Sequence, residues 1–299
     1  MARTFSTPRA FKTSLEDRLK LRSRTTGVDL HRIRQLLIME RFLVRVFQYF
    51  DERAILKGGL VLELRLEQAR ATKDVDLGLK GNPQELLTQL QELGRIESGD
   101  FLTFETRADL KHPEILAEGM VYQGFRYKVQ AYLAGKVYGS PYGVDIAMAE
   151  PIFGEPEILT GSSELSFAGL APPEFRVYPL ETHLSEKLHA YTMPRPRPNS
   201  RVKDLPDIAL IGTLKEFQAI DLREAIRWTF RHRTSHERPH QLPPPSDDWG
   251  PVYVKMAKAN SLPWSTLDEV YQAARTFMDP VLEGSAGFWS PTDWKWSTP

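Results

Sequence analysis

The sequence predicts an α/β fold of the α+β type, in which a mixed or antiparallel sheet comes first and a mainly helical region follows. Short segments of alternating polar and apolar residues occur between residues 54 and 149, and such alternation is typical of half-buried strands. Several of these segments follow one another with only turn residues between them, which favours a meander over a doubly wound sheet. After residue 178 the apolar residues recur at helical spacing instead.

The length is enough for two domains, or for one domain with an appended helical bundle, and the composition favours a boundary that divides the chain in two. The chain has 299 residues, and Pro, Gly and Ser gather at residues 150–175. We therefore expect an N-terminal domain over residues 1–170 and a mainly helical C-terminal domain over residues 171–299. Lys plus Arg and Asp plus Glu each number 39, so any nucleic-acid contact must come from a local basic patch. The chain has no cysteine, which excludes disulfides, zinc–thiolate sites and cysteine nucleophiles.

The sequence also predicts where the protein works. The first residues lack the apolar core of a secretory signal, and no apolar stretch approaches the length that spans a membrane. We expect a cytoplasmic protein with no membrane partner. Hydrophobic residues make up 41% and charged residues 26% of the chain, which is typical of soluble globular proteins.

The chain begins with helices. Residues 1–13 are expected to form a loose arm, and a charged helix is expected over residues 14–24. A second helix begins after Asp29, which can cap it, and its apolar residues keep helical spacing up to Phe50.

Strands and shorter helices follow. Strands are expected at residues 54–56, 74–79, 101–107 and 125–133 and within residues 137–149. Short helices are expected over residues 60–68 and from Pro83 onward. In the C-terminal region, helices are expected over residues 179–190, from residue 201 onward, and over residues 221–233, 251–259 and 266–283.

Two carboxylates in the strand at residues 74–79 form the first candidate site. Side chains two apart on a strand point to the same face, so Asp74 and Asp76 project together. Adjacent carboxylates repel each other unless a cation lies between them, and Mg²⁺ prefers such oxygen ligands. Upstream, Gly58 and Gly59 remove side chains where the backbone can approach a phosphate. These features predict phosphoryl or nucleotidyl transfer, although half-buried strands commonly carry exposed acidic residues.

A second candidate site lies in the helical region. Lys187 lies off the apolar stripe of its helix, and Asp204 and Asp207 are three residues apart, so on a helix they share a face. By themselves these residues favour an ordinary salt bridge between helices. Asp145 lies between apolar residues of a later strand, and by itself it is read as a strand-end residue exposed to solvent.

The order of these motifs resembles a known family. A Gly-Gly turn, a short helix and then Asp-x-Asp on a strand are the signature of the DNA polymerase beta-like nucleotidyltransferase superfamily. The segments LKGGLVLEL, RATKDVDL, EKLHA and RVKDLPDI are similar to those of its AbiEii-type toxin branch, which includes the mycobacterial MenT toxins. The resemblance covers residues 56–210. The chain departs from the family pattern at Lys73, where an acidic residue is common, and at Pro206, where an aromatic residue is common.

The resemblance implies a polymerase beta-like nucleotidyltransferase core and a role for each motif. It implies that Mg²⁺, or Mn²⁺, is held by Asp74, Asp76 and Asp145. It aligns Lys187 with the essential lysine of the family, which neutralises a phosphate of the NTP substrate, while backbone N–H groups of Gly58 and Gly59 meet the phosphates. It aligns Asp204 and Asp207 with the downstream acidic motif, and leaves open whether they orient the lysine, bind the nucleotide or activate the acceptor.

The implied function is that of a toxin with a cognate antitoxin protein, in a family associated with phage defence. Relatives transfer a nucleotide from CTP or another pyrimidine NTP to the 3′ end of tRNA, which blocks aminoacylation and translation. Thr72 lies two residues before Asp74, and a phosphate there would repel metal and triphosphate. Candidates for contacts with RNA phosphates are Arg195, Arg197, Arg201, Arg227 and Arg231.

Two alternatives stay open from the sequence. One is a nucleotidyltransferase whose acceptor is a protein hydroxyl or a small molecule. The other is a non-enzymatic nucleotide-binding protein that keeps the fold. The presence of Asp74, Asp76 and Lys187 argues against the second, because a decayed site would be expected to lose at least one of them.

Overall fold

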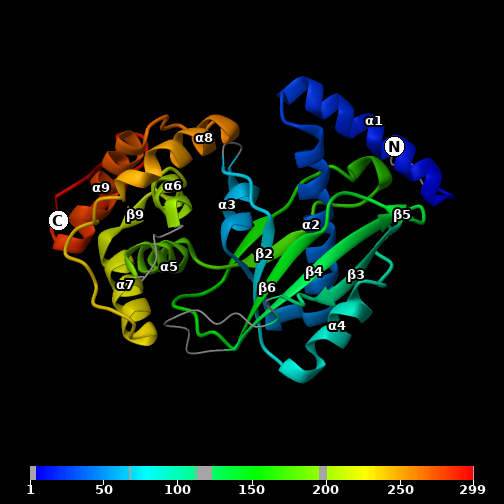
Figure 1. Cartoon of the computed structure of the whole chain (residues 1–299), viewed down its shortest axis with the longest axis horizontal. Helices are drawn as coiled ribbons and strands as arrows, with labels where there is room; N and C mark the ends of the chain where they lie inside the picture. Colours follow the sequence, from blue (N-terminus) through cyan, green and yellow to red (C-terminus); the bar gives the residue numbers. More distant parts are fainter. Residues whose placement is uncertain (1–4, 67–68, 112, 114–122, 195–200, 299) are drawn as a thin grey trace.

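The α/β fold is confirmed by the computed structural model, which describes residues 5–66, 69–111, 113, 123–194 and 201–298. A mixed sheet with helices packed against it occupies one side of the molecule, and a helical region occupies the other (Figure 1). Among the helices in the described parts of the chain, none combines the length and the apolar character that crossing a membrane requires.

Within the described residues, eight strands form the main sheet in the order β3-β4-β6-β2-β1-β8-β7, with β5 paired to β4. The strands are β1 (Ala54–Lys57), β2 (Asp74–Leu79), β3 (Leu102–Ala108), β4 (Gly124–Leu133), β5 (Lys136–Val137), β6 (Tyr142–Met148), β7 (Glu157–Thr160) and β8 (Glu174–Val177). The antiparallel pairs β3–β4 and β4–β6 form the meander that the sequence predicts. The sheet is mixed because β2 runs parallel to β6, and β1 runs parallel to β8.

The N-terminal helices are α1 (Pro8–Thr26) and α2 (Leu30–Phe50). The prediction of a loose arm over residues 1–13 is wrong from Pro8 onward. Thr7 caps α1 by accepting a hydrogen bond from the Ala10 N–H, and Pro8 at the first helical position has no backbone N–H that would need an acceptor. The start of α2 is as predicted, because the Asp29 side chain accepts from the Arg32 N–H.

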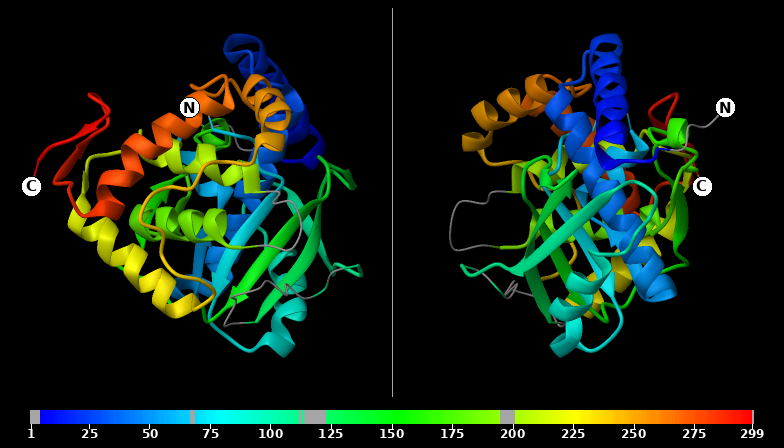
Figure 2. Two further views of the ribbon diagram at one scale, coloured as in Figure 1. Left: turned by 60° about the vertical axis from the view of Figure 1, so that its left-hand side comes forward. Right: turned by 90° about the vertical axis from the view of Figure 1, so that its right-hand side faces the viewer.

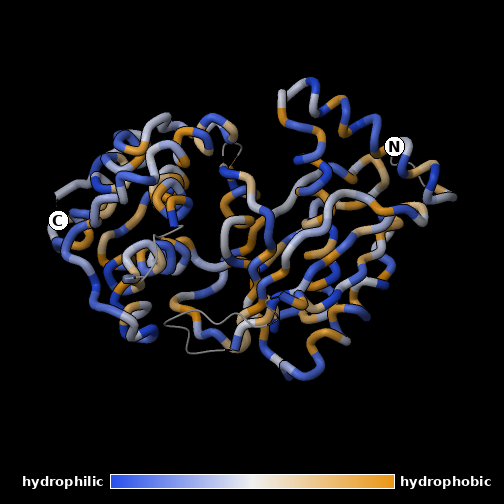
Figure 3. The backbone as a smooth tube through the Cα atoms, viewed as in Figure 1, coloured by the Kyte–Doolittle hydropathy of each residue, from blue (hydrophilic) through white to orange (hydrophobic). Residues whose placement is uncertain are grey.

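The core of the sheet region lies between α2 and one face of the sheet. Phe42 and Val46 of α2 are fully buried, and so are Val75 and Leu77 of β2. Each such side chain contributes about 1.5–3 kcal/mol when buried. Two of the views show α2 running along the sheet (Figure 2), and polar and apolar residues alternate along the strands (Figure 3). The opposite face of β2 therefore carries its polar residues.

Two further helices belong to this part of the molecule. The first is α3 (Gly59–Arg65), which follows β1 directly and contacts β2. The second is α4 (Leu86–Leu93), which follows a short 3-10 helix at Pro83–Glu85 and packs against β3. Both were expected from the sequence, although α3 ends earlier than predicted.

The helical region contains α5 (Leu180–Thr192), α6 (Asp204–Ile211), α7 (Ala219–Arg233), α8 (Gly250–Asn260) and α9 (Leu267–Glu283). A small sheet of β9 (Phe217–Gln218), β10 (Phe288–Ser290) and β11 (Lys295–Trp296) closes it. The sequence does not predict this sheet. Trp289 is 1% exposed, and its ring N–H donates to the Gly212 carbonyl at 2.7 Å. Trp289 therefore packs on the body of the protein, whereas its neighbour Phe288 is exposed.

Two hydrophobic clusters divide the chain. One extends from Phe11 to Val177, and the other consists of Leu62 and residues from Leu180 to Trp289. The change between clusters falls at the junction of β8 and α5. The domain division at residue 170 stays a prediction.

Candidate active site

The carboxylates of β2 point away from the core. Val75 and Leu77 are fully buried, so Asp74 and Asp76 project from the opposite face of the strand. Strand register places Asp76 between Lys57 of β1 and Asp145 of β6. The three aspartates thus lie on one face of two adjacent parallel strands.

Two glycines make room for these carboxylates. A Cβ atom at Gly58, which has φ +73°, would overlap the Asp76 carboxylate. A Cβ atom at Gly143 of β6, which pairs with Asp74, would overlap the Oδ1 atom of Asp74. Both positions therefore require glycine for steric reasons, and Gly58 requires it for its backbone angle as well.

The Asp pair carries more negative charge than the surrounding protein balances. Burial raises the pKa of Asp76 to about 6, and the charges of Asp145 and Asp74 add to the shift, although Lys57 and Lys187 oppose it. Desolvation and the charge of Asp145 likewise raise the pKa of Asp74. Raised carboxylate pKa values of this kind indicate a site that favours an added proton or cation.

Asp145 differs from the Asp pair because it already has a cationic partner. The Arg126 guanidinium of β4 donates to both Asp145 oxygens, at 2.7 and 2.6 Å. Among the residues that the structure describes, no group of three or more His, Asp or Glu side chains is arranged to hold a metal ion. The donor set nevertheless fits a divalent cation, because two carboxylates suffice when water and phosphates complete its shell.

Lys187 of α5 lies between the two carboxylates of α6. Its ammonium is 2.7 Å from Asp207 Oδ2 and 3.1 Å from Asp204 Oδ1. Arg70, in the segment before β2, donates to both Asp207 oxygens at 2.9 and 2.8 Å. The structure thus joins the predicted lysine to both predicted aspartates, and adds an arginine that links them to the β2 segment.

The electrostatic state of Asp207 is opposite to that of Asp76. Asp207 is 0% exposed, and burial by itself would raise its pKa. The two cations Lys187 and Arg70 instead hold the pKa of Asp207 well below its usual value. Burial likewise opposes the charge of Lys187, but Asp207 and Asp204 raise the pKa of Lys187.

The two groups of residues act on one another. The charge of Lys187 lowers the pKa of Asp76, and the charge of Asp76 raises that of Arg70. Lys203, just before α6, lowers the pKa of Asp74. Helix α5 and the turn before α6 therefore bring Lys187 and Lys203 close to the Asp pair, and α6 lies next to α3 (Figure 1).

A buried ionic network adjoins the site through Lys57. This lysine pairs with Glu150, which also accepts from Arg233 of α7 at 2.8 Å and from the Tyr178 hydroxyl at 3.0 Å. Arg233 reaches Glu186 of α5 at 2.9 Å as well. Burial and the charge of Glu150 raise the pKa of Glu186 to about 7. The network ties the sheet to α5 and α7.

Several of these residues escaped the sequence analysis. Arg70 stands inside the RATKDVDL motif, and Lys57 directly precedes the Gly pair, so their positions were visible although their partners were not. Arg126 was less evident from the sequence, because the alternation of residues along its strand showed only which face of the sheet it occupies. The partners of all three come from distant segments.

The remaining predicted residues lie in different surroundings. Thr72 is 6% exposed, and its hydroxyl donates to the Asp74 carbonyl at 3.4 Å. Arg201 lies 3.5 Å from Asp204, and Arg227 and Arg231 are exposed on α7. Arg195 and Arg197 lie outside the described residues.

Comparison with known proteins identifies the reaction class. Residues 41–273 match the family described as nucleotidyl transferase AbiEii toxin, type IV TA system. No curated protein matches the chain. Among solved structures, MenT4, a nucleotidyltransferase toxin from Mycobacterium tuberculosis H37Rv, is similar over 92% of each chain, with a TM-score of 0.58 and 14% identity.

A second solved structure, JHP933 from Helicobacter pylori, is similar over 86% of this chain and 94% of that chain, with a TM-score of 0.48 and 15% identity. At such identities the likeness to MenT4 shows the fold, whereas the family match covers most of the chain. The chain therefore belongs to the AbiEii family of nucleotidyltransferase toxins of type IV toxin–antitoxin systems, whose members use an NTP substrate and have an antitoxin partner.

Proposed function

We propose that the protein transfers a nucleoside monophosphate from CTP, or another pyrimidine NTP, to the 3′ end of tRNA in the cytoplasm. The product cannot be aminoacylated, so translation stops. The observation that carries the proposal is the incompletely neutralised pair Asp74 and Asp76, with Lys187 close enough to lower the pKa of Asp76. An NTP brings both the phosphates and the accompanying cation that such a site lacks.

Each residue of the site has a role in this proposal. Asp74 and Asp76 hold a divalent cation, Mg²⁺ or Mn²⁺. When bound, such a cation lowers the pKa of the attacking hydroxyl and offsets the charge of the triphosphate. The backbone N–H groups of Gly58 and Gly59 face the phosphates. Asp145 is a further metal carboxylate only when Arg126, which takes both its oxygens, turns away.

Lys187 stabilises the triphosphate and is held in place by α6. An ammonium has three donors, and in the described residues Asp204 and Asp207 lie within ion-pair distance of it. We assign the remaining donor to a β- or γ-phosphate oxygen, where positive charge stabilises the leaving pyrophosphate. Asp204 and Asp207 are positioning residues in this proposal, since both reach Lys187.

Two predictions concern the periphery of the site. Arg201, Arg227 and Arg231 stay candidates for RNA contacts. Phosphorylation of Thr72 would add negative charge beside the Asp pair and inactivate the enzyme. Because Thr72 is 6% exposed, a kinase would reach it only after the segment before β2 opens.

The proposal is tested by labelling. Purified protein is incubated with total tRNA, Mg²⁺ and each radiolabelled NTP in turn, beside the variants Asp76→Ala and Asp221→Asn. Asp221 is an exposed acidic residue of α7 and serves as the control. We expect label from one pyrimidine NTP in tRNA with wild type and Asp221→Asn, and none with Asp76→Ala.

Two results would contradict the proposal. Label that persists in tRNA with Asp76→Ala would remove Asp76 from the reaction. Label that enters the toxin, another protein or a small molecule, but no RNA, would replace tRNA with one of the alternative acceptors.

A further inference from the structure

Two rows of side chains cross the polar face of the sheet. In the first row, strand register aligns Lys57, Asp76, Asp145 and Arg126 across β1, β2, β6 and β4. In the second row, it aligns Asp74 with Gly143, then Lys128 of β4, then Arg107 of β3. The first row has a cation at each end of its two carboxylates, whereas the second row runs from the Asp74 carboxylate to the cations Lys128 and Arg107.

Arg107 and Lys128 form a basic pair at the end of the second row. They are direct cross-strand partners, and like charges in that relation destabilise a sheet. Lys128 has a side chain that is 48% exposed and lies 3.6 Å from Asp109. Arg107 is exposed, and it forms no ion pair with any residue that the structure describes. Asp109 therefore lies within ion-pair distance of Lys128 alone, and the two adjacent cations favour an anionic ligand.

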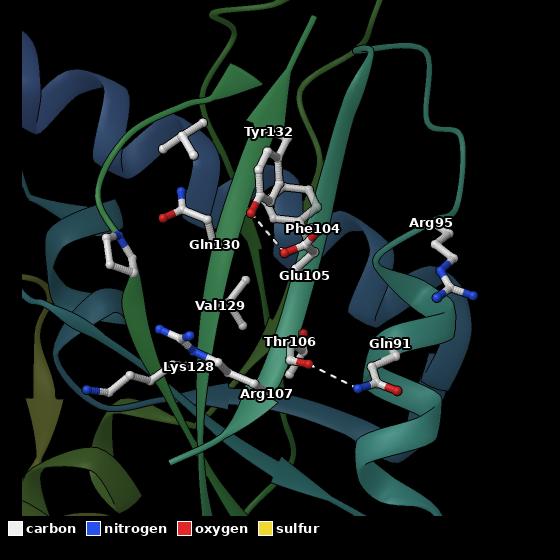
Figure 4. A pocket seen from close by; sticks show the side chains of 12 residues that line it. Gln91, Arg95, Phe104, Glu105, Thr106, Arg107, Lys128, Val129, Gln130 and Tyr132 are labelled. Carbon is white, nitrogen blue, oxygen red and sulfur yellow. Dashed lines mark hydrogen bonds between the residues drawn. The ribbon is translucent and has the colours of Figure 1, made fainter. Parts of the chain in front are cut away.

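A hollow surrounds this basic pair. Its volume is about 490 Å³, and Arg107, Lys128, Gln130 and Tyr132 are among the residues that line it. Lys128, Arg107 and Gln130 project from one side of the strands, whereas Gln91 of α4 and Arg95, just after that helix, lie on the other (Figure 4). Three cations and one carboxylate, Glu105, line the hollow, and Glu105 accepts from the Tyr132 hydroxyl at 2.8 Å.

The spacing separates the basic pair from the reacting phosphates. Neighbouring strands lie about 4.8 Å apart, so β4 and β3 are about 10 and about 14 Å from β2. These backbone spacings place Lys128 and Arg107 beside the Asp pair and not within it. They are well placed for the backbone of a longer, negatively charged substrate whose end lies at Asp74 and Asp76.

We propose that Arg107 and Lys128 bind the phosphate backbone of an RNA acceptor and guide its 3′ end along the second row to Asp74. The inference rests on the proposed function, because it requires RNA to be the acceptor. Neutral side chains in the same hollow, such as Gln130 and Tyr132, are suited to contacts with sugar and base. The contacts are with phosphates, so they raise affinity without selecting a sequence.

The test compares two matched double variants of the full-length protein. Arg107→Gln with Lys128→Gln removes the pair. Lys20→Gln with Arg24→Gln removes the same charge from exposed positions of α1 and is the control. Affinity for labelled tRNA is measured by fluorescence anisotropy over a series of salt concentrations. Affinity for an NTP analogue with Mg²⁺ and the unfolding temperature are measured in parallel.

We expect the Arg107/Lys128 variant to bind tRNA less tightly and with a shallower dependence on salt. The ratio of the tRNA affinity of the wild type to that of the variant should fall roughly tenfold as salt rises from about 50 to about 200 mM, because the variant makes two fewer phosphate contacts. NTP binding and the unfolding temperature should match those of the control. In the transfer assay, KM for tRNA should rise while kcat stays the same.

Three outcomes would overturn the inference. If tRNA is labelled but the pair variant shows the salt slope of the control, the inference fails and the proposed function stands. If the variant loses affinity for the NTP instead, the pair belongs to the triphosphate site. If wild-type protein neither binds nor labels RNA, the inference and the proposed function fail together.

Discussion

The aspartates of β2 and those of α6 lie near each other but differ in how their charge is balanced. Asp207 is fully buried between Lys187 and Arg70, and its pKa is held low. Asp76 has no cation in such direct contact among the described residues, and its pKa is raised to about 6. Burial favours the neutral form of both carboxylates, so the supply of protein cations makes the difference.

This difference separates two kinds of acidic residue within one site. The charge on Asp207 is already balanced when the protein folds, so it stabilises the fold and positions Lys187. The charge on Asp76 is balanced only when something binds. We therefore expect the charge of Asp76 to lower the stability of the protein without ligand, and to be balanced by the cation that the proposed function requires.

The largest effect is expected from Asp76→Asn, which keeps the shape of the side chain and removes its charge. Nucleotide transfer should fall by at least about a thousandfold, or about 4 kcal/mol of transition-state stabilisation. Stability of the metal-free variant should be at least that of the wild type. Transfer rates and chemical denaturation of the same preparations check this prediction. A variant that is inactive because it is unfolded would remove the distinction between the two acidic groups.

The next effect concerns Asp207→Asn, which leaves Lys187 and Arg70 buried without their shared carboxylate. We expect the free energy of unfolding to fall by about 3–5 kcal/mol, because breaking a buried ion pair exposes an unbalanced charge to a poorly solvating interior. Denaturant unfolding measures it, with Asp221→Asn on the surface of α7 as the control. A loss no larger than that of the control would show that this cluster does not stabilise the fold.

Asp76 and Asp207 should affect the pH dependence of stability in opposite directions. Each should change the free energy of unfolding by about 1–3 kcal/mol across its pH range. The folded pKa of Asp76, about 6, lies above its ordinary value of 3.8. The folded protein therefore holds this proton more tightly, and metal-free stability should fall as pH rises from about 4 to about 6. For Asp207 the folded pKa is lowered, so its contribution should disappear as pH falls below about 4.

Chemical denaturation in the presence of a chelator measures this pH dependence. In Asp76→Asn, the free energy of unfolding should no longer decrease between about pH 4 and about pH 6. Its decrease below about pH 4, which we assign to Asp207, should remain. An unaltered profile in Asp76→Asn would contradict the origin assigned to this part of the curve.

The smallest effect is expected from Gly143→Ala, which adds a methyl group where Asp74 lies. Because that methyl group would overlap Asp74 Oδ1, the carboxylate must move, and transfer should fall by about tenfold, or about 1.4 kcal/mol. Gly250→Ala is a matched control, since no atom lies within 4 Å of its added Cβ. Equal rates in the two variants would show that the position of Asp74 is not critical.

The sequence predicted the local parts of this arrangement well. Residues 74–79 form a strand with both aspartates on one face, because alternation is a local property of the chain. The cap at Asp29 and the apolar spacing of α2 were equally readable. Motif order grouped Lys187 with Asp204 and Asp207 before the structure showed their contact.

The contacts that decide the electrostatics were beyond prediction. Arg70 and Asp207 are 137 residues apart, and Arg126 meets Asp145 only because β4 and β6 pair in a particular register. Such partners depend on the packing of distant elements. Periodicity along the chain carries no information on that packing, so the sequence predicted which carboxylates belong to the candidate site but not which of them are neutralised.

The most direct test of this account is the unfolding temperature of three proteins as Mg²⁺ is added with a non-hydrolysable NTP analogue. Wild type and Asp207→Asn should both become more stable as the ligands bind, although the variant starts lower. Asp76→Asn should start at or above the wild type and gain much less. If Asp76→Asn gains as much as the wild type, the β2 carboxylates are not the metal and nucleotide site, and the central claim is wrong.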